Sequence, residues 1–76
     1  MFTMSSNLSV QDIINQINDQ IINDARVGNR LSSLTYQKQA VDISKLEEAK
    51  IVIEELGYQV KIITDNPTVN TIQVHF

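Results

Sequence analysis

The sequence predicts an α+β fold, in which two amphipathic helices pack on a small antiparallel sheet. Apolar residues recur at helical spacing over residues 10–25 and again over residues 46–56, and they alternate with polar residues over most of residues 58–76. The first two patterns indicate helices, and the third indicates a β-hairpin. With an edge strand or an extended connector between the helices, the expected order is α-(β)-α-β-β.

A chain of 76 residues forms one domain, which we expect over residues 9–76 after a flexible N-terminus at residues 1–8. Such a short chain buries only about 60% of the surface that it exposes when unfolded, so its core is small. The sequence contains no cysteine, and therefore neither a disulfide framework nor a thiolate metal site can stiffen the domain. Apolar packing has to stabilise the fold, and a second subunit would add to it.

The first helix is expected to begin near Val10. Ser9 and Asp12 have the spacing at which a hydroxyl and a carboxylate satisfy the free N–H groups of a helix start. Ile22 widens the apolar face of this helix beyond what a small hairpin needs to cover. That face is formed by Val10, Ile13, Ile14, Ile17, Ile21 and Ala25.

The end of the first helix has two interpretations. Gly28 either adopts the left-handed conformation that ends a helix, or lies inside a helix that continues to about Ser32. The helical wheel favours the longer helix, because Gly28 and Leu31 fall on its apolar face. Asp24 lies near the same face, where it either pairs with an arginine or marks the point at which the helix leaves the core.

We assign residues 34–43 to an edge strand, and a continuing helix is the alternative. Val41 and Ile43 alternate with polar neighbours, and Thr35 and Tyr36 are residue types that favour strands. This segment joins the two predicted helices.

The second helix is expected to open with a capping box formed by Ser44 and Glu47. Gly57 stands where a left-handed C-cap belongs, so the helix should end there. Ile51 points away from the apolar stripe. The stripe itself consists of Leu46, Ala49, Val52, Ile53 and Leu56.

The C-terminal hairpin is expected to turn around Pro67, whose ring presets the backbone of the turn. A one-residue slip would place the apolar residues of the two strands on opposite faces, so the alternation defines the register. Ile63 then falls on the outward face of the hairpin. The inward-facing pairs are Ile62 with Ile72, Val60 with Val74, and Tyr58 with Phe76.

The sequence offers little that points to catalysis or to a cofactor. His75 is the single histidine, and we place it on the outward face opposite Gln59, without a group to orient it. The glutamate pairs at residues 47–48 and 54–55 have lysines nearby, which is typical of a solvated helix face rather than a metal site. The chain has no Gly-rich phosphate loop and no metal-ligand spacing. We therefore expect a protein that is not an enzyme and that holds no metal or cofactor.

Nucleic-acid binding is the alternative function. The formal net charge of −3 argues against it, but the segment between Ala25 and Val41 contains no carboxylate. Its cations could contact phosphates while a tyrosine stacks on a base. The candidate contacts are Arg26, Arg30, Tyr36, Lys38 and, outside the segment, Lys61.

The leading hypothesis is a non-enzymatic protein-protein interaction module that docks to a partner protein or to itself, as a homodimer. Apolar residues that their own patterns do not bury indicate this function, because association would remove them from water. The candidate interface residues are Ile22, Ile51 and Ile63.

Composition suggests a small accessory or regulatory protein of a bacterium or phage. Isoleucine, asparagine and glutamine are abundant while tryptophan and cysteine are absent, which is typical of an AT-rich genome. No stretch approaches the roughly 20 apolar residues of a membrane span. We therefore expect a protein that has no membrane partner. It should lie in the cytoplasm, or in the host cytoplasm if a phage encodes it.

Overall fold

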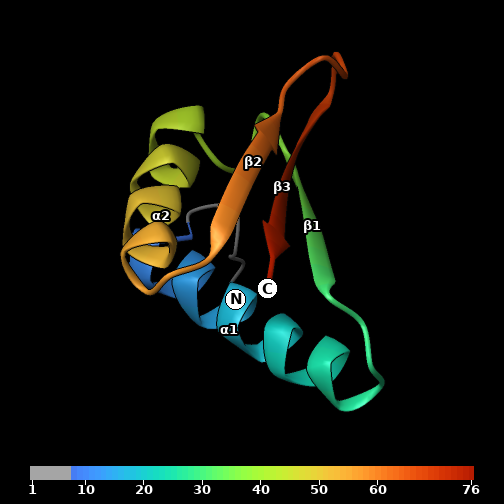
Figure 1. Cartoon of the computed structure of the whole chain (residues 1–76). Coiled ribbons are helices and arrows are strands. Elements are labelled where there is room, and N and C mark those ends of the chain that lie inside the picture. Colours follow the sequence, from blue (N-terminus) through green and yellow to red (C-terminus); the bar gives the residue numbers. More distant parts are fainter. Residues whose placement is uncertain (1–7) are drawn as a thin grey trace, which may run out of the picture.

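The computed structural model describes residues 8–76, in which two helices pack on one face of a three-stranded antiparallel sheet (Figure 1). This arrangement confirms the predicted α+β class and the order α-β-α-β-β. The elements of this part of the chain are α1 (Val10–Arg26), β1 (Leu31–Gln37), α2 (Ile43–Glu55), β2 (Gln59–Ile63) and β3 (Val69–His75).

The start of α1 follows the prediction. The Ser9 hydroxyl accepts a hydrogen bond from the Asp12 backbone N–H, and the Asp12 carboxylate accepts one from the Ser9 N–H, each at 3.1 Å. Leu8 packs against the core just before this capping box. The other residues of the predicted flexible N-terminus, residues 1–7, lie outside the described part of the chain.

The end of α1 shows that the longer predicted helix is wrong. The helix stops at Arg26, and Gly28 has a left-handed φ of 86°, so the first of the two interpretations holds. Leu31 and Ser32 belong to β1 instead. The helical wheel misplaced this boundary because it registers only side-chain direction, whereas hydrogen bonds to Asp24 turn the chain here.

Asp24 connects the last turn of α1 to the first residues of β1. Its carboxylate accepts hydrogen bonds from the Ser32 hydroxyl at 2.6 Å, from the Gln20 amide at 3.1 Å and from the Asn29 amide at 3.2 Å. Its backbone carbonyl accepts from the N–H groups of Val27 and Asn29. These bonds, led by the one from Ser32, lower the pKa of the Asp24 carboxyl below its ordinary value of 3.8. Asp24 therefore marks the point at which the helix ends.

We expect Asp24→Asn to lower the thermal unfolding midpoint at pH 7, because the amide removes the charge and one acceptor oxygen. A lowered pKa in the folded state adds stability above the unfolded-state pKa, and that stability disappears as the pH falls through the folded-state pKa. The difference between the wild type and Asp24→Asn should therefore shrink below about pH 4. Circular dichroism melts from pH 7 to pH 2.5 test this, with the exposed Asp19→Asn as the control. Equal midpoints of wild type and variant at pH 7 would contradict it.

The segment between the helices contains the predicted edge strand, but its bounds differ from the predicted ones. β1 runs from Leu31 to Gln37 and lies at one edge of the sheet. Val41 is buried in a turn, where its N–H donates to the carbonyl of Gln37. Ile43 begins α2. The alternation of Val41 and Ile43 therefore comes from a turn and a helix start rather than from a strand.

The predicted capping box of the second helix is wrong, whereas its predicted end is confirmed. Asp42 is the N-cap and its side chain makes no capping hydrogen bond, so Ser44 already lies inside the helix. The backbone carbonyl of Asp42 accepts from the N–H groups of Lys45 and Leu46. At the other end, Gly57 has a φ of 101° and follows the C-cap Leu56.

The hairpin has the predicted register. β2 pairs with β3 so that Ile62 lies opposite Ile72 and Val60 opposite Val74, a pairing centred on Pro67. Before that proline, the Asn66 side chain accepts hydrogen bonds from Thr68 and Val69 and orders the turn. Next to the last paired residues, the rings of Tyr58 and Phe76 pack edge to face at 6.3 Å.

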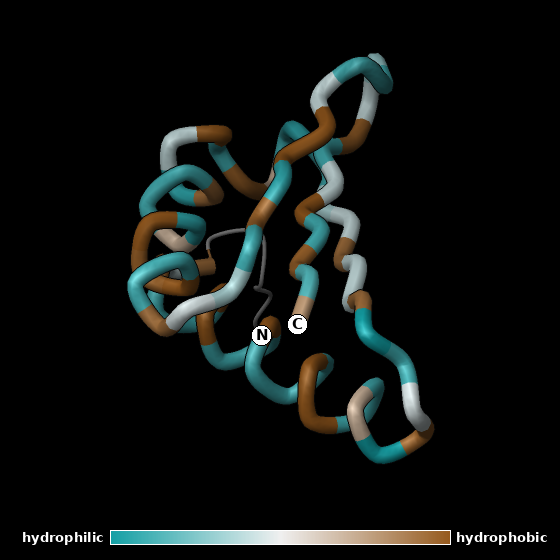
Figure 2. The backbone as a smooth tube through the Cα atoms, viewed as in Figure 1, coloured by the Kyte–Doolittle hydropathy of each residue, from teal (hydrophilic) through white to brown (hydrophobic). Residues whose placement is uncertain are grey.

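β3 is the central strand, because β1 pairs with its other side and also runs antiparallel to it. The polypeptide thus forms a β-α-β unit, β1-α2-β2, with β3 inserted between the two strands. Figure 2 shows hydrophobic and hydrophilic residues alternating along the strands, as expected when helices cover one face only. The fully buried side chains of the core are Ile13, Ile17, Leu46, Ala49, Ile53, Ile72 and Val74.

The stripe of α2 is narrower than the sequence predicts. Leu46, Ala49 and Ile53 are fully buried, but Val52 and Leu56 are exposed. Ile51 is exposed, in agreement with the prediction that it points away from the stripe.

Ile53→Ala should destabilise the fold by about 2–5 kcal/mol, because it removes a fully buried side chain and leaves a cavity. Ile51→Ala, two residues earlier on the exposed side of the same helix, should change stability by about 0.5 kcal/mol or less. Urea unfolding followed by circular dichroism compares the two variants. Similar losses in both would show that the face of α2 packed on the sheet is not the one described.

Candidate functional site

The predicted interface residues are placed on three different elements. Ile22 on α1 is 51% exposed and Ile51 on α2 is 57% exposed, while Ile63 on β2 is partly buried. Around Ile51, α2 also exposes Val52 and Leu56, which the sequence assigned to the core. We call Ile51, Val52 and Leu56 the apolar flank of α2.

Carboxylates border this apolar flank. On a helix, residues three and four apart are neighbours. Glu48 therefore lies one turn before both Ile51 and Val52, and Glu55 lies one turn after them. Both glutamates are exposed. The apolar flank thus combines hydrophobic side chains with negative charge.

The outer face of the sheet is mostly polar. In the described part of the chain both helices lie on the inner face, where the buried strand residues point. On the outer face, the hydroxyls of Thr35 and Thr71 lie 3.2 Å apart across β1 and β3. His75 is exposed there, opposite Gln59 as predicted and opposite Leu31 on its other side. None of these neighbours is a group that would orient a catalytic imidazole.

The structure does not gather the predicted nucleic-acid contacts into one patch. Arg30 precedes β1 and Lys38 follows it, so an extended strand of roughly 25 Å separates the two. Lys61 lies on the outer face of the opposite edge strand, and Arg26 ends α1. Tyr36 is only 9% exposed, so its ring offers no open face to a base.

The position of Tyr36 is explained by a structural role. Its hydroxyl donates a hydrogen bond to the Gln16 side-chain carbonyl on α1, at 2.7 Å. Burial raises the pKa of the Tyr36 hydroxyl above its ordinary value, because the charged form would be desolvated. Tyr36 therefore joins β1 to α1.

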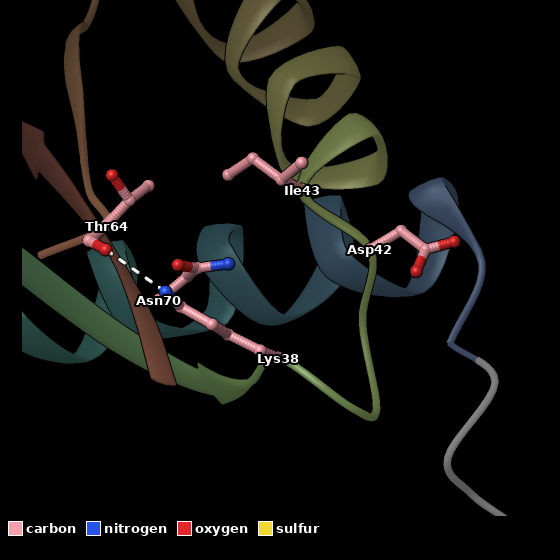
Figure 3. A pocket seen from close by; sticks show the side chains of 5 residues that line it. All are labelled: Lys38, Asp42, Ile43, Thr64 and Asn70. Carbon is pink, nitrogen blue, oxygen red and sulfur yellow. Dashed lines mark hydrogen bonds between the residues drawn. The ribbon is translucent and has the colours of Figure 1, made fainter. Parts of the chain in front are cut away.

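An open cavity of about 510 Å³ lies where α2 begins (Figure 3). It is lined by Lys38, Asp42, Ile43, Thr64 and Asn70. Asn70 is buried whereas the other four residues are exposed, so the cavity leads from an open rim to a buried amide. We call it the Asn70 cavity.

Strand alternation explains why polar groups meet in the Asn70 cavity. On the inner face of β3, Val74 and Ile72 are followed toward the turn by Asn70, and on β2 the inner residue Ile62 is followed by Thr64. Apolar packing thus gives way to polar side chains at this end of the sheet. Asn70 was not among the predicted site residues, although extending the alternation of the tail by one step would have placed it inside.

Lys38 crosses this polar end of the inner face. Its backbone N–H donates to the Thr68 carbonyl at 2.9 Å, which anchors the end of β1 to β3. Its ammonium donates to the backbone carbonyl of Thr64 at 3.1 Å, as the dashed line in Figure 3 shows. The ammonium is therefore held next to Asn70 rather than extended into solvent.

The amide of Asn70 has unused hydrogen-bonding capacity. The residue is 4% exposed, and its side-chain oxygen has no hydrogen-bond partner among residues 8–76. Leaving such an oxygen buried and unpaired costs about 1–3 kcal/mol. Native structures rarely leave a buried polar atom unpaired, so the Asn70 oxygen at the cavity wall is a candidate group for binding a ligand.

The described residues offer little support for metal binding. Among residues 8–76, no group of three histidine or acidic side chains is placed to hold a metal ion. In the same range, neither helix has the length and hydrophobicity needed to cross a membrane.

Comparison with known proteins adds no relative. No protein-family model, no curated protein sequence and no solved structure matches the chain.

Proposed function

We propose that the chain is a non-enzymatic protein-interaction module that docks to a partner protein through the apolar flank of α2. The observation that carries this proposal is the exposure of Ile51, Val52 and Leu56, at 57%, 38% and 61%. Ile51 lies opposite the fully buried residues of α2 and Val52 lies beside them. Leu56 follows the buried Ile53 by three residues, at the exposed C-terminal end of the helix. Val52 and Leu56 are neighbours one turn apart, and Ile51 adjoins Val52 in the sequence, so the three exposed apolar side chains are gathered at the C-terminal end of α2.

The charges around the flank define the chemistry of the partner. α2 carries four glutamates, at positions 47, 48, 54 and 55, against two lysines. A partner segment with apolar anchors between lysines or arginines complements this surface, as in helix-in-groove recognition. Two copies meeting flank to flank would instead bring glutamates together. The flank therefore favours a basic partner over self-association.

We expect the chain to bind a basic amphipathic helical peptide with isoleucine and leucine anchors, and to bind a peptide with lysines exchanged for glutamates much more weakly. The double variant Ile51→Ser, Leu56→Ser should weaken binding at least about tenfold, because it removes two apolar contacts. Fluorescence anisotropy measures both affinities.

The control for this experiment is Ile22→Ser, an exposed isoleucine on α1 that should leave binding unchanged. Circular dichroism verifies that each variant is folded. Equal binding of the acidic and basic peptides, or of the double variant and the wild type, would contradict docking through the flank.

A homodimer is a second form of association, and β1 is the element that favours it. This edge strand has seven residues without a charge, a proline or a glycine. Such an edge is a template for pairing with another strand. Antiparallel pairing with the β1 of a second copy, centred on Leu34, would produce a continuous six-stranded sheet.

This pairing would set Arg30 of each copy opposite Lys38 of the other, so added salt should strengthen the dimer by screening the repulsion. Salt should have the reverse effect on binding of a basic peptide to α2. Sedimentation equilibrium at low and high salt measures the first effect. Ser33→Lys, which adds a charge to the exposed edge strand, should weaken the dimer. A monomer at every concentration and salt level would contradict self-association.

A further inference from the structure

We propose that the Asn70 cavity binds a carboxylate with a neighbouring N–H donor. This is the chemistry shared by a peptide C-terminus and a free N-acylamino acid. The cavity volume of about 510 Å³ falls within the range of small-ligand sites, about 300–1,000 Å³. Its five lining residues supply the Lys38 cation, the buried Asn70 amide, the exposed apolar side chain of Ile43, the Thr64 hydroxyl and the Asp42 carboxylate.

The carboxylate would contact Lys38 and the start of α2. The Lys38 ammonium has three donors, and its bond to Thr64 uses one of them. The first N–H groups of a helix and its dipole also attract anions, and the Asp42 side chain does not cap them. Figure 3 shows the Asp42 carboxylate pointing away from Lys38, Thr64 and Asn70. It therefore leaves the position near the ammonium open to a ligand anion.

The N–H donor of the ligand would bond to Asn70. A side-chain amide oxygen accepts, and this one is buried without a partner among the described residues. The oxygen has almost no accessible surface, so the Asn70 side chain has to rotate slightly for the ligand donor to reach it. The hydrogen bond then replaces an unsatisfied buried acceptor, whose desolvation cost is already part of the folded state. In a peptide C-terminus, the N–H next to the carboxylate lies one carbon away from it. It can therefore reach Asn70 while the carboxylate contacts Lys38.

The apolar wall of the cavity is supplied by Ile43. This side chain is 40% exposed at the first position of α2. In Figure 3 the Ile43 side chain extends toward Thr64 and faces Asn70. An aliphatic side chain on the ligand would cover it, so we choose leucine as the last residue of the probes.

N-acetyl-leucine is the first probe, followed by heteronuclear NMR of the isotope-labelled chain. We expect saturable shifts at the amides of Lys38, Ile43, Thr64 and Asn70. N-acetyl-leucinamide lacks the carboxylate, and 4-methylpentanoate lacks the N–H donor. Each should bind at least about tenfold more weakly than N-acetyl-leucine. Equal binding of the amide, or absence of saturable shifts up to about 10 mM N-acetyl-leucine, would overturn the proposal.

Two variants test the residues. Lys38→Gln keeps a polar side chain at an exposed position and should reduce the affinity at least about tenfold. Asn70→Leu removes the unpaired oxygen at similar size. It should abolish binding without lowering the thermal unfolding midpoint, because an unsatisfied polar group is lost. A lower midpoint in Asn70→Leu, together with unchanged affinity in Lys38→Gln, would show that Asn70 has a structural role only.

The two sources of the ligand are distinguished by a pentapeptide that ends in leucine, tested with a free and with an amidated C-terminus. At least tenfold tighter binding than N-acetyl-leucine indicates a peptide C-terminus, and equal affinity indicates a small acylamino acid. Both outcomes require the free carboxylate to bind more tightly than the amide. The Ile51→Ser, Leu56→Ser variant should retain this binding, so failure at the cavity and failure at the apolar flank remain separate results.

Discussion

The packing of β3 against the helices is the constraint on which the rest of the structure depends. Ile72 and Val74 are fully buried, and β1 and β2 pair with β3 rather than with each other. The last strand of the described chain is therefore the central one. Consequently β1 and β2 are both edge strands, and the inner face of β3 determines what lies beneath the start of α2. The surfaces available for binding follow from this topology.

The sequence predicted the elements that depend on local chemistry. The hairpin register follows from strict alternation on both sides of Pro67, and the start of α1 follows from the reciprocal bonds of Ser9 and Asp12. The two wrong boundaries depend on contacts that such patterns do not register. Ser32 bonds to Asp24 eight residues earlier, and burial of Val41 brings the chain into α2 before Ser44. Tertiary contacts override helical periodicity at both places.

The same distinction applies to the candidate sites. Exposure of Ile51 could be predicted because its direction on the helix is a local property. Exposure of Val52 and Leu56 could not, since it depends on how much of α2 the neighbouring elements cover. The Asn70 cavity joins residues from β1, β3, the start of α2 and the end of β2. Only the strand order β1-β3-β2 brings Lys38, Thr64 and Asn70 together.

The two proposed binding surfaces lie on one helix but select opposite charges. The start of α2 combines the positive end of the helix dipole with Lys38, whereas its second half carries the apolar flank with Glu48 and Glu55. Leu56 lies thirteen positions after Ile43, which is about 20 Å along the helix axis. An extended segment needs about six residues to span that distance. A single partner could therefore occupy both surfaces only if about six or more residues separated its C-terminal carboxylate from a basic, apolar stretch.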